Sequence, residues 1–180
     1  MEIKLADVSL IEEFKLPEYT EIPDVGLYLK QVVKYINDSV GKYFGFTVTD
    51  SMLSNYVKMH IVKNPIKKAY YREHIAAFIF VSMAKSVLSL EDIDWVFKVQ
   101  QASYSPESSY KWFKSRFERT LKKVFLQKLD ATRHNRENDE QALLNSIVYT
   151  MAYKFYLVCC IKHNAIPEPA EPKKEKKAKG

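Results

Sequence analysis

The chain has 180 residues, of which 47% are hydrophobic and 13% aromatic, and its formal net charge is +6. A chain this long and this apolar can bury one sizeable core, which excludes a largely disordered protein. Only 4 Gly and 7 Pro interrupt it, so its long apolar-periodic stretches predict a mainly α-helical fold.

The charges are segregated along the chain. Residues 1–24 hold seven acids against two lysines, residues 47–72 hold five bases against Asp50 alone, and residues 106–136 hold nine bases against three acids. This pattern suits a protein with one positive face that attracts a polyanion, although ordinary solvated helix faces produce it as well.

The N-terminal residues 1–22 form an acidic arm. Ser9 followed by Glu12 resembles a capping box and predicts a short helix over residues 9–15. Pro17 and Pro23 then predict an extended connector, with Pro23 placed to enter the first turn of the next helix. That helix is expected over residues 24–43, where apolar residues recur at helical spacing, and Gly45 ends it.

Residues 23–103 predict a helix-turn-helix domain with a small wing. A second helix is expected over residues 50–60, with Thr49 as its N-cap. The loop VKNPIKKAY follows, in which Val62 and Ile66 are placed to form a short strand pair. A third helix over residues 71–86 is nearly all apolar and should form the centre of the domain. Ser89 with Asp92 predicts a capping box that begins a fourth helix.

Residues 104–163 predict a pair of long helices. Pro106 opens a helix over residues 106–129, and a second follows over residues 138–162. The second is apolar almost all round from Ile147 onward, so it is either wrapped by the other helices or shared with a second copy. The hairpin therefore packs on the preceding domain or dimerises. The Lys- and Pro-rich tail, residues 164–180, is expected to be disordered.

A helix-turn-helix presents polar side chains to a DNA groove, and the second helix offers a suitable set. Asparagine can bind adenine in a bidentate way, and lysine, serine and threonine bind phosphates or bases. The candidate DNA-binding residues are Thr49, Ser51, Ser54, Asn55 and Lys58 on this helix, and Lys63, Lys67, Lys68, Tyr70 and Arg72 in and after the loop. A capped surface helix followed by a solvated loop is the alternative interpretation.

These segments also match a known pattern, at Tyr56, Ile61, Tyr70, Arg72 and the SLEDI segment of residues 89–93. The pattern resembles the DNA-binding domain of the mercury-resistance-regulator (MerR) superfamily. More closely, LPEYTEIPDVGLYLKQVVKYI, TDSMLSNYVK, NPIKKAYYREHIA and SLEDI resemble a bacterial family of uncharacterised proteins, domain of unknown function 1836, over roughly residues 16–125. The resemblance implies a helix-turn-helix architecture and a role in transcription regulation.

The chain departs from the superfamily pattern at two positions. Ser54 stands where the superfamily has an arginine in the recognition helix, which removes the phosphate contact that this arginine implies. His60 stands where the superfamily has the turn glycine, and histidine adopts positive φ less readily. The long dimerisation helix of the superfamily has no clear heptad match, although the two C-terminal helices can serve instead.

Residues able to carry catalysis or bind a cofactor are sparse. The four histidines, His60, His74, His134 and His163, form no metal-ligand spacing, and there is no Gly-rich phosphate loop. We therefore expect no enzyme activity, no metal and no cofactor. The adjacent Cys159 and Cys160 exclude an intramolecular disulfide framework. They are expected to be buried thiols, with soft-metal binding or oxidant sensing as the alternative.

The chain starts with acids rather than an apolar run, so no signal peptide is expected. Its longest apolar stretch, residues 147–161, contains Lys154 and falls short of the ~20 residues of a membrane span. The sequence thus predicts a cytoplasmic, DNA-binding transcription regulator that binds double-stranded DNA as a homodimer through its C-terminal helices.

The alternative hypothesis is a non-enzymatic protein-interaction module on the same scaffold. Asp50, which would repel phosphate, and the departures at Ser54 and His60 favour it. The bases of the helix over residues 106–129 distinguish the two: on the same face as the second helix they support nucleic acid, and on the opposite face they do not.

Overall fold

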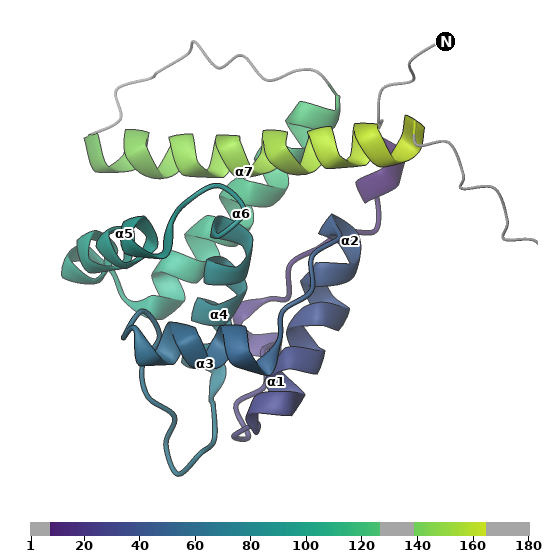
Figure 1. The fold of residues 1–180 in the computed structure, drawn as a ribbon. Coiled ribbons are helices and arrows are strands. Elements are labelled where there is room, and N and C mark those ends of the chain that lie inside the picture. Colours follow the sequence, from purple (N-terminus) through teal and green to yellow (C-terminus); the bar gives the residue numbers. More distant parts are fainter. Residues whose placement is uncertain (1–7, 127–138, 165–180) are drawn as a thin grey trace, which may run out of the picture.

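The computed structural model describes residues 8–126 and 139–164, and these residues are mainly helical (Figure 1). The elements are the 3-10 helices η1 (Val8–Ile11) and η2 (Tyr19–Glu21), helix α1 (Leu29–Ile36), the π-helical segment η3 (Asn37–Gly41), and helices α2 (Lys42–Phe44), α3 (Asp50–Lys58), α4 (Arg72–Ala84), α5 (Leu90–Ser103), α6 (Pro106–Phe125) and α7 (Asp139–Asn164). The helix predicted over residues 9–15 is shorter than expected and consists of the 3-10 turn η1. The predicted disordered tail lies, from residue 165 onward, outside the described residues.

The first long helix begins later than the sequence predicted. Leu27 pairs with Tyr70 through two backbone hydrogen bonds of 2.8 Å, which keeps residues 23–28 out of the helix. Gly26 has φ +77°, and a Cβ there would lie 3.2 Å from the Ala69 side chain. The expectation that Pro23 enters the first turn was therefore wrong, because pairing with a distant segment outweighs the local helical signal.

The end of this first helical stretch widens into the π-helical segment η3. The Asn37 side chain accepts from Val48 N–H at 2.9 Å and donates to Val48 O at 3.0 Å, which fixes the approach to α3. A Cβ at Gly41 would lie 2.6 Å from Phe46 O, so only glycine fits there. Gly45, with φ +69°, ends the helix as predicted.

Helix α4 forms the centre of the core, as its apolar sequence predicted. Ile75, Phe78 and Ile79 are fully buried, and α4 contacts α1, α6 and α7. Phe80 of α4 packs its ring against Phe97 of α5 and Phe113 of α6. The core therefore runs across the boundary that the sequence suggested at residues 103–104.

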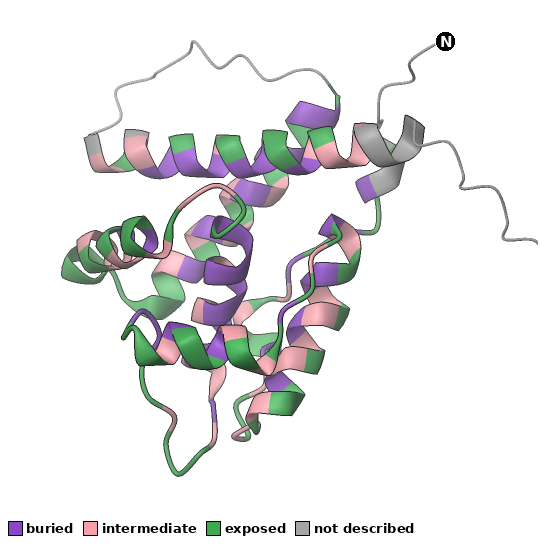
Figure 2. Cartoon of the chain, in the orientation of Figure 1, coloured by how far each residue is buried: buried purple, intermediate pink, exposed green. Residues whose placement is uncertain are grey.

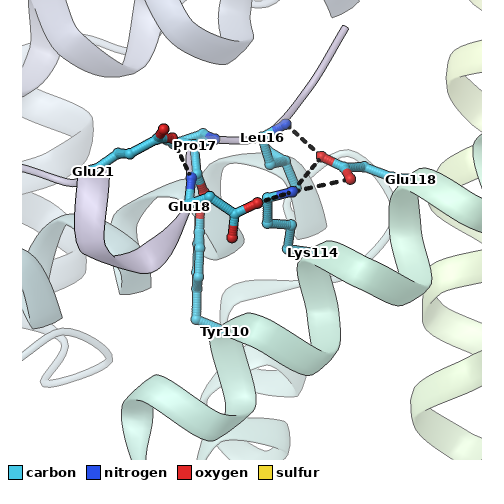
Figure 3. Close-up of polar contacts among 7 residues, drawn as sticks. All are labelled: Leu16, Pro17, Glu18, Glu21, Tyr110, Lys114 and Glu118. Atoms are coloured by element: carbon cyan, nitrogen blue, oxygen red, sulfur yellow. Dashed lines mark hydrogen bonds and ion pairs between the residues drawn. The ribbon is translucent and has the colours of Figure 1, made fainter.

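The N-terminal segment is part of this core rather than a detached arm (Figure 2). Leu16 and Ile22 are buried, and the ring of Phe14 lies 4.6 Å from that of Phe44. Hydrogen bonds join the same segment to α6. Leu16 N–H donates to Glu118 at 2.8 Å, and the Tyr110 hydroxyl donates to Pro17 O at 3.0 Å (Figure 3).

Helices α6 and α7 pack along each other, and α7 also contacts α2 and α4. The rings of Phe44 and Phe155 stack with centroids 4.0 Å apart. The C-terminal hairpin thus packs on the rest of the chain. One helix of the described residues, α7, is long and apolar enough over Leu143–Cys160 to cross a membrane by length and composition, and 44% of that window is buried inside the protein.

Candidate nucleic-acid interface

Helix α3 presents a polar, solvent-exposed face. Its N-cap is Thr49, as predicted, and the Thr49 hydroxyl accepts from Met52 N–H at 3.3 Å. Leu53 and Tyr56 point into the core, which leaves the opposite side of the helix exposed. The exposed residues of the predicted set are Thr49, Ser51, Ser54, Asn55 and Lys58. The helical period therefore brings together all five candidates that the sequence placed here.

A tight turn ends α3 at the position where the superfamily has glycine. His60 has φ +59°, the left-handed conformation that glycine adopts most easily. Its N–H donates to Val57 O at 2.9 Å, and Ile61 N–H donates to Tyr56 O at 3.1 Å. These two bonds form a Schellman motif, and the buried Ile61 and Tyr56 supply its apolar contact. The turn thus forms with histidine at the position where the resemblance predicted glycine.

The tip of the loop after α3 is a two-residue turn formed by Lys67 and Lys68. Ile66 and Ala69 exchange backbone hydrogen bonds of 3.0 and 2.9 Å, so the predicted pairing of Val62 with Ile66 was wrong. Lys67 and Lys68 have φ +49° and +67°, as the central residues of a type I′ hairpin turn do. Both side chains are exposed, and the loop projects from the body of the molecule (Figure 1).

The base of this loop is anchored to α4. His74 accepts from Tyr71 N–H at Nδ1 and lies 3.1 Å from Asn64 O at Nε2. Lys63 forms an ion pair with Glu73 on the first turn of α4. No sequence pattern indicates this role for His74, because its two partners become neighbours only when the loop folds back.

Three predicted interface residues have partners inside the protein. Tyr70 is 6% exposed, and its ring contacts Phe78; burial raises the pKa of its hydroxyl. The Arg72 guanidinium donates from Nε to Ile22 O at 2.9 Å and pairs with Asp24. Lys63 is neutralised by Glu73. The structure thus leaves Lys58, Lys67 and Lys68 as the cations of this surface.

The bases of α6 do not extend the α3 surface. Lys111 pairs with Glu107, Lys114 pairs with Glu18 and Glu118, and Arg116 donates to the Tyr149 hydroxyl at 2.8 Å. The C-terminal end of α6 reaches α7, whereas the loop after α3 projects from the other end of the molecule (Figure 1). Arg119, Lys122 and Lys123 are exposed but belong to this C-terminal half of α6, away from the loop (Figure 1), so α6 gives no support to a nucleic-acid interface centred on α3.

No group of His, Cys, Asp and Glu suited to a metal ion occurs among the described residues. Cys159 and Cys160 are half-buried on α7 and pack against the core, rather than fully buried as the sequence suggested.

A family model described as a domain of unknown function (DUF1836) matches residues 17–116. This match covers the chain from residue 17 through α1 to α5 and half of α6, and so includes the whole candidate interface. No curated protein and no solved structure matches the chain.

Proposed function

The chain belongs to the DUF1836 family, and we propose that it is a transcription regulator that binds double-stranded DNA through a MerR-like helix-turn-helix. In this proposal α3 enters the major groove, and the loop after it acts as a wing on the sugar-phosphate backbone.

The conformation of the Lys67–Lys68 turn is the observation that carries the proposal. A left-handed residue other than glycine costs about 1 kcal/mol, and such strain concentrates at functional sites. Asn-Gly forms the same turn without this strain. A pair of lysines instead places two exposed charges at the tip of a projecting loop, which suits contact with phosphates.

The face of α3 supplies the groups that read bases. Ser51, Ser54 and Asn55 are exposed and short, so the helix can approach the groove closely. Asn55 has the amide that binds adenine in a bidentate way, and within the described residues this amide makes a weak contact to the Met59 sulfur at 3.5 Å.

The small number of available cations favours binding as a dimer. Each copy can make about three phosphate contacts, through Lys58, Lys67 and Lys68. The logarithm of the DNA-binding constant should then fall with the logarithm of the salt concentration with a slope of about −3 for one copy and about −5 for two. We propose that α7 supplies the dimer contact, because Tyr153 and Leu157 on its outer side are 39% and 55% exposed. A two-fold dimer predicts a near-palindromic site. Its place of action is the cytoplasm.

The test is selection of bound duplexes from sheared genomic DNA by the full chain near physiological salt, followed by sequencing. The proposal predicts one enriched, near-palindromic sequence whose preference relaxes in Asn55→Ala but not in Ser115→Ala, an exposed change on α6. Retention without enrichment, or no retention at all, contradicts specific DNA binding.

A protein-interaction module on the same scaffold is the second candidate. The position of the exposed α6 bases, away from the loop after α3 (Figure 1), and the exposed apolar side of α7 favour it. The Leu157→Glu variant distinguishes the DNA-binding regulator from the protein-interaction module. A DNA-binding dimer becomes monomeric and loses DNA affinity, whereas a module of this second kind shows no DNA binding with or without the change.

A further inference from the structure

An open groove, here called the α6 groove, lies on the surface between α6 and the N-terminal segment. Its volume is about 430 Å³, within the range of roughly 300–1,000 Å³ that small-molecule sites occupy. Every residue that lines it is polar or charged, and the set is Glu18, Lys111, Lys114, Ser115, Glu118, Arg119 and Lys122. None of these residues belongs to the candidate DNA interface. The α6 groove therefore suits a small, polar ligand at a place remote from α3.

One side of the groove is held in place by Lys114, which is 11% exposed. Its ammonium group lies 2.9 Å from a Glu18 oxygen and 3.1 Å from a Glu118 oxygen (Figure 3). Glu118 also accepts from Leu16 N–H at 2.8 Å. These three charged side chains bind one another, so they shape the groove and leave its remaining cations to meet a ligand.

The other side of the groove carries donors that have no partner. Ser115, Arg119 and Lys122 are four and three residues apart, so they form a row on one face of α6. All three are exposed, and none has a hydrogen-bond or ion-pair partner in the part of the chain that the structure describes. Lys111 lies one turn before Ser115 and is paired with Glu107. The row thus presents two uncompensated positive charges and a hydroxyl group.

The chemistry of this row fits phosphoryl groups. A guanidinium offers a planar fork of donors that matches phosphate oxygens, an ammonium group adds a compact charge, and a serine hydroxyl adds a neutral donor. At 1.5 Å per residue, the row from Ser115 to Lys122 extends over about 10 Å, which suits two linked phosphoryl groups better than one. The carboxylates of Glu18 and Glu118 border the row. They would repel a long polyanion, such as a nucleic-acid strand, that lay across the groove.

From this geometry we propose that the α6 groove binds a compact, soluble anion with two linked phosphoryl groups. Inorganic diphosphate and the diphosphate end of a nucleotide share this chemistry. Arg119, in the middle of the row, contacts both phosphoryl groups, and Ser115 and Lys122 bind their outer oxygens. This site is independent of whether α3 binds DNA.

Titration of the full chain with sodium diphosphate tests the ligand chemistry, by isothermal calorimetry near physiological salt and without divalent cations. Citrate, a tricarboxylate of similar charge, is the matched anion. We expect saturable binding of diphosphate at one site per chain and at least tenfold weaker binding of citrate. Titration with ADP distinguishes the two sources: an affinity above that of diphosphate identifies a nucleotide, and an affinity no higher identifies diphosphate itself. Absence of saturable binding by both compounds, or equal affinity for diphosphate and citrate, overturns the proposal.

Matched substitutions test the location. Arg119→Gln and Lys122→Gln each remove one charge from the row, whereas Lys123→Gln removes the same charge from an exposed neighbouring position that does not line the groove. Affinity for diphosphate should fall at least tenfold in the first two variants and stay nearly unchanged in the third. All three side chains are exposed, so the variants should fold, which circular dichroism checks. Unchanged affinity in the folded Arg119→Gln protein, or an equal loss in Lys123→Gln, overturns the proposal.

Discussion

Arg72 at the start of α4 is joined to Asp24 across 48 residues of sequence. The guanidinium lies 3.5 Å from the carboxylate, and the Arg72 N–H donates to the same side chain at 3.1 Å. Further bonds reach Ile22 O and Thr20 O, so one side chain fixes the segment that leads into α1.

We therefore predict that Arg72→Ala lowers the stability of the fold rather than the number of phosphate contacts. Hydrogen bonds to a charged group contribute about 1.5–3 kcal/mol, and Arg72 is 28% exposed, so a loss of about 2 kcal/mol in urea unfolding is expected. Lys85→Ala, an exposed change just after α4, should stay within about 0.5 kcal/mol. If the folded Arg72→Ala protein instead showed a salt dependence of DNA binding weaker by about one phosphate contact, Arg72 would be part of the DNA interface.

Local signals predicted the helices and several of their ends. Thr49 and Ser89 accept the predicted cap bonds, and Pro106 begins α6, because capping depends on residues within one turn. Periodicity also identified α4 as the core helix and the exposed face of α3.

Contacts between distant segments could not be predicted in this way. Tyr70 and Arg72 look like interface residues in a sequence, yet Leu27, Ile22 and Asp24 engage them once the N-terminal segment packs beside α4. The left-handed lysines had no signal at all, since lysine is not a residue that favours positive φ.

The Lys67–Lys68 turn allows stability and DNA binding to be separated. Replacing the pair by Asn-Gly relieves left-handed strain at both positions, and we expect unfolding free energy to rise by about 1 kcal/mol. The same change removes two phosphate contacts, so the salt slope should fall by about 2 for each copy. Thermal unfolding and fluorescence anisotropy at several salt concentrations measure the two effects. Arginine at both positions is the charge control and should retain the slope; a stabilised Asn-Gly protein that binds DNA unchanged would show that the turn has no part in binding.

His60 offers a test of the turn that ends α3. Because its φ is +59°, His60→Gly should stabilise the protein by about 1 kcal/mol without altering the Schellman bonds. Met59→Gly is the matched control. Its φ is −80°, so glycine there only adds freedom to the unfolded chain and should destabilise by about 0.5–1 kcal/mol. Equal effects of the two substitutions on the melting temperature would mean that His60 carries no strain.

Lys114 should stabilise the junction between the N-terminal segment and α6. It is 11% exposed, 2.9 Å from Glu18 and 3.1 Å from Glu118 (Figure 3). Burial opposes its charge, but the hydrogen bonds to both carboxylates outweigh burial and raise its pKa. We expect Lys114→Met to cost about 2 kcal/mol, and Lys111→Met, which breaks an exposed pair with Glu107, to cost under about 0.5 kcal/mol.

The pH dependence of this contribution follows from the direction of the shift. A raised pKa in the folded state means that the stabilisation is complete below the ordinary lysine value of 10.5 and is lost as pH rises through the folded value. The stability difference between wild type and Lys114→Met should therefore be constant from pH 7 to 9 and shrink only in strong alkali. A difference that disappears between pH 7 and 9 would contradict the assigned ion pairs.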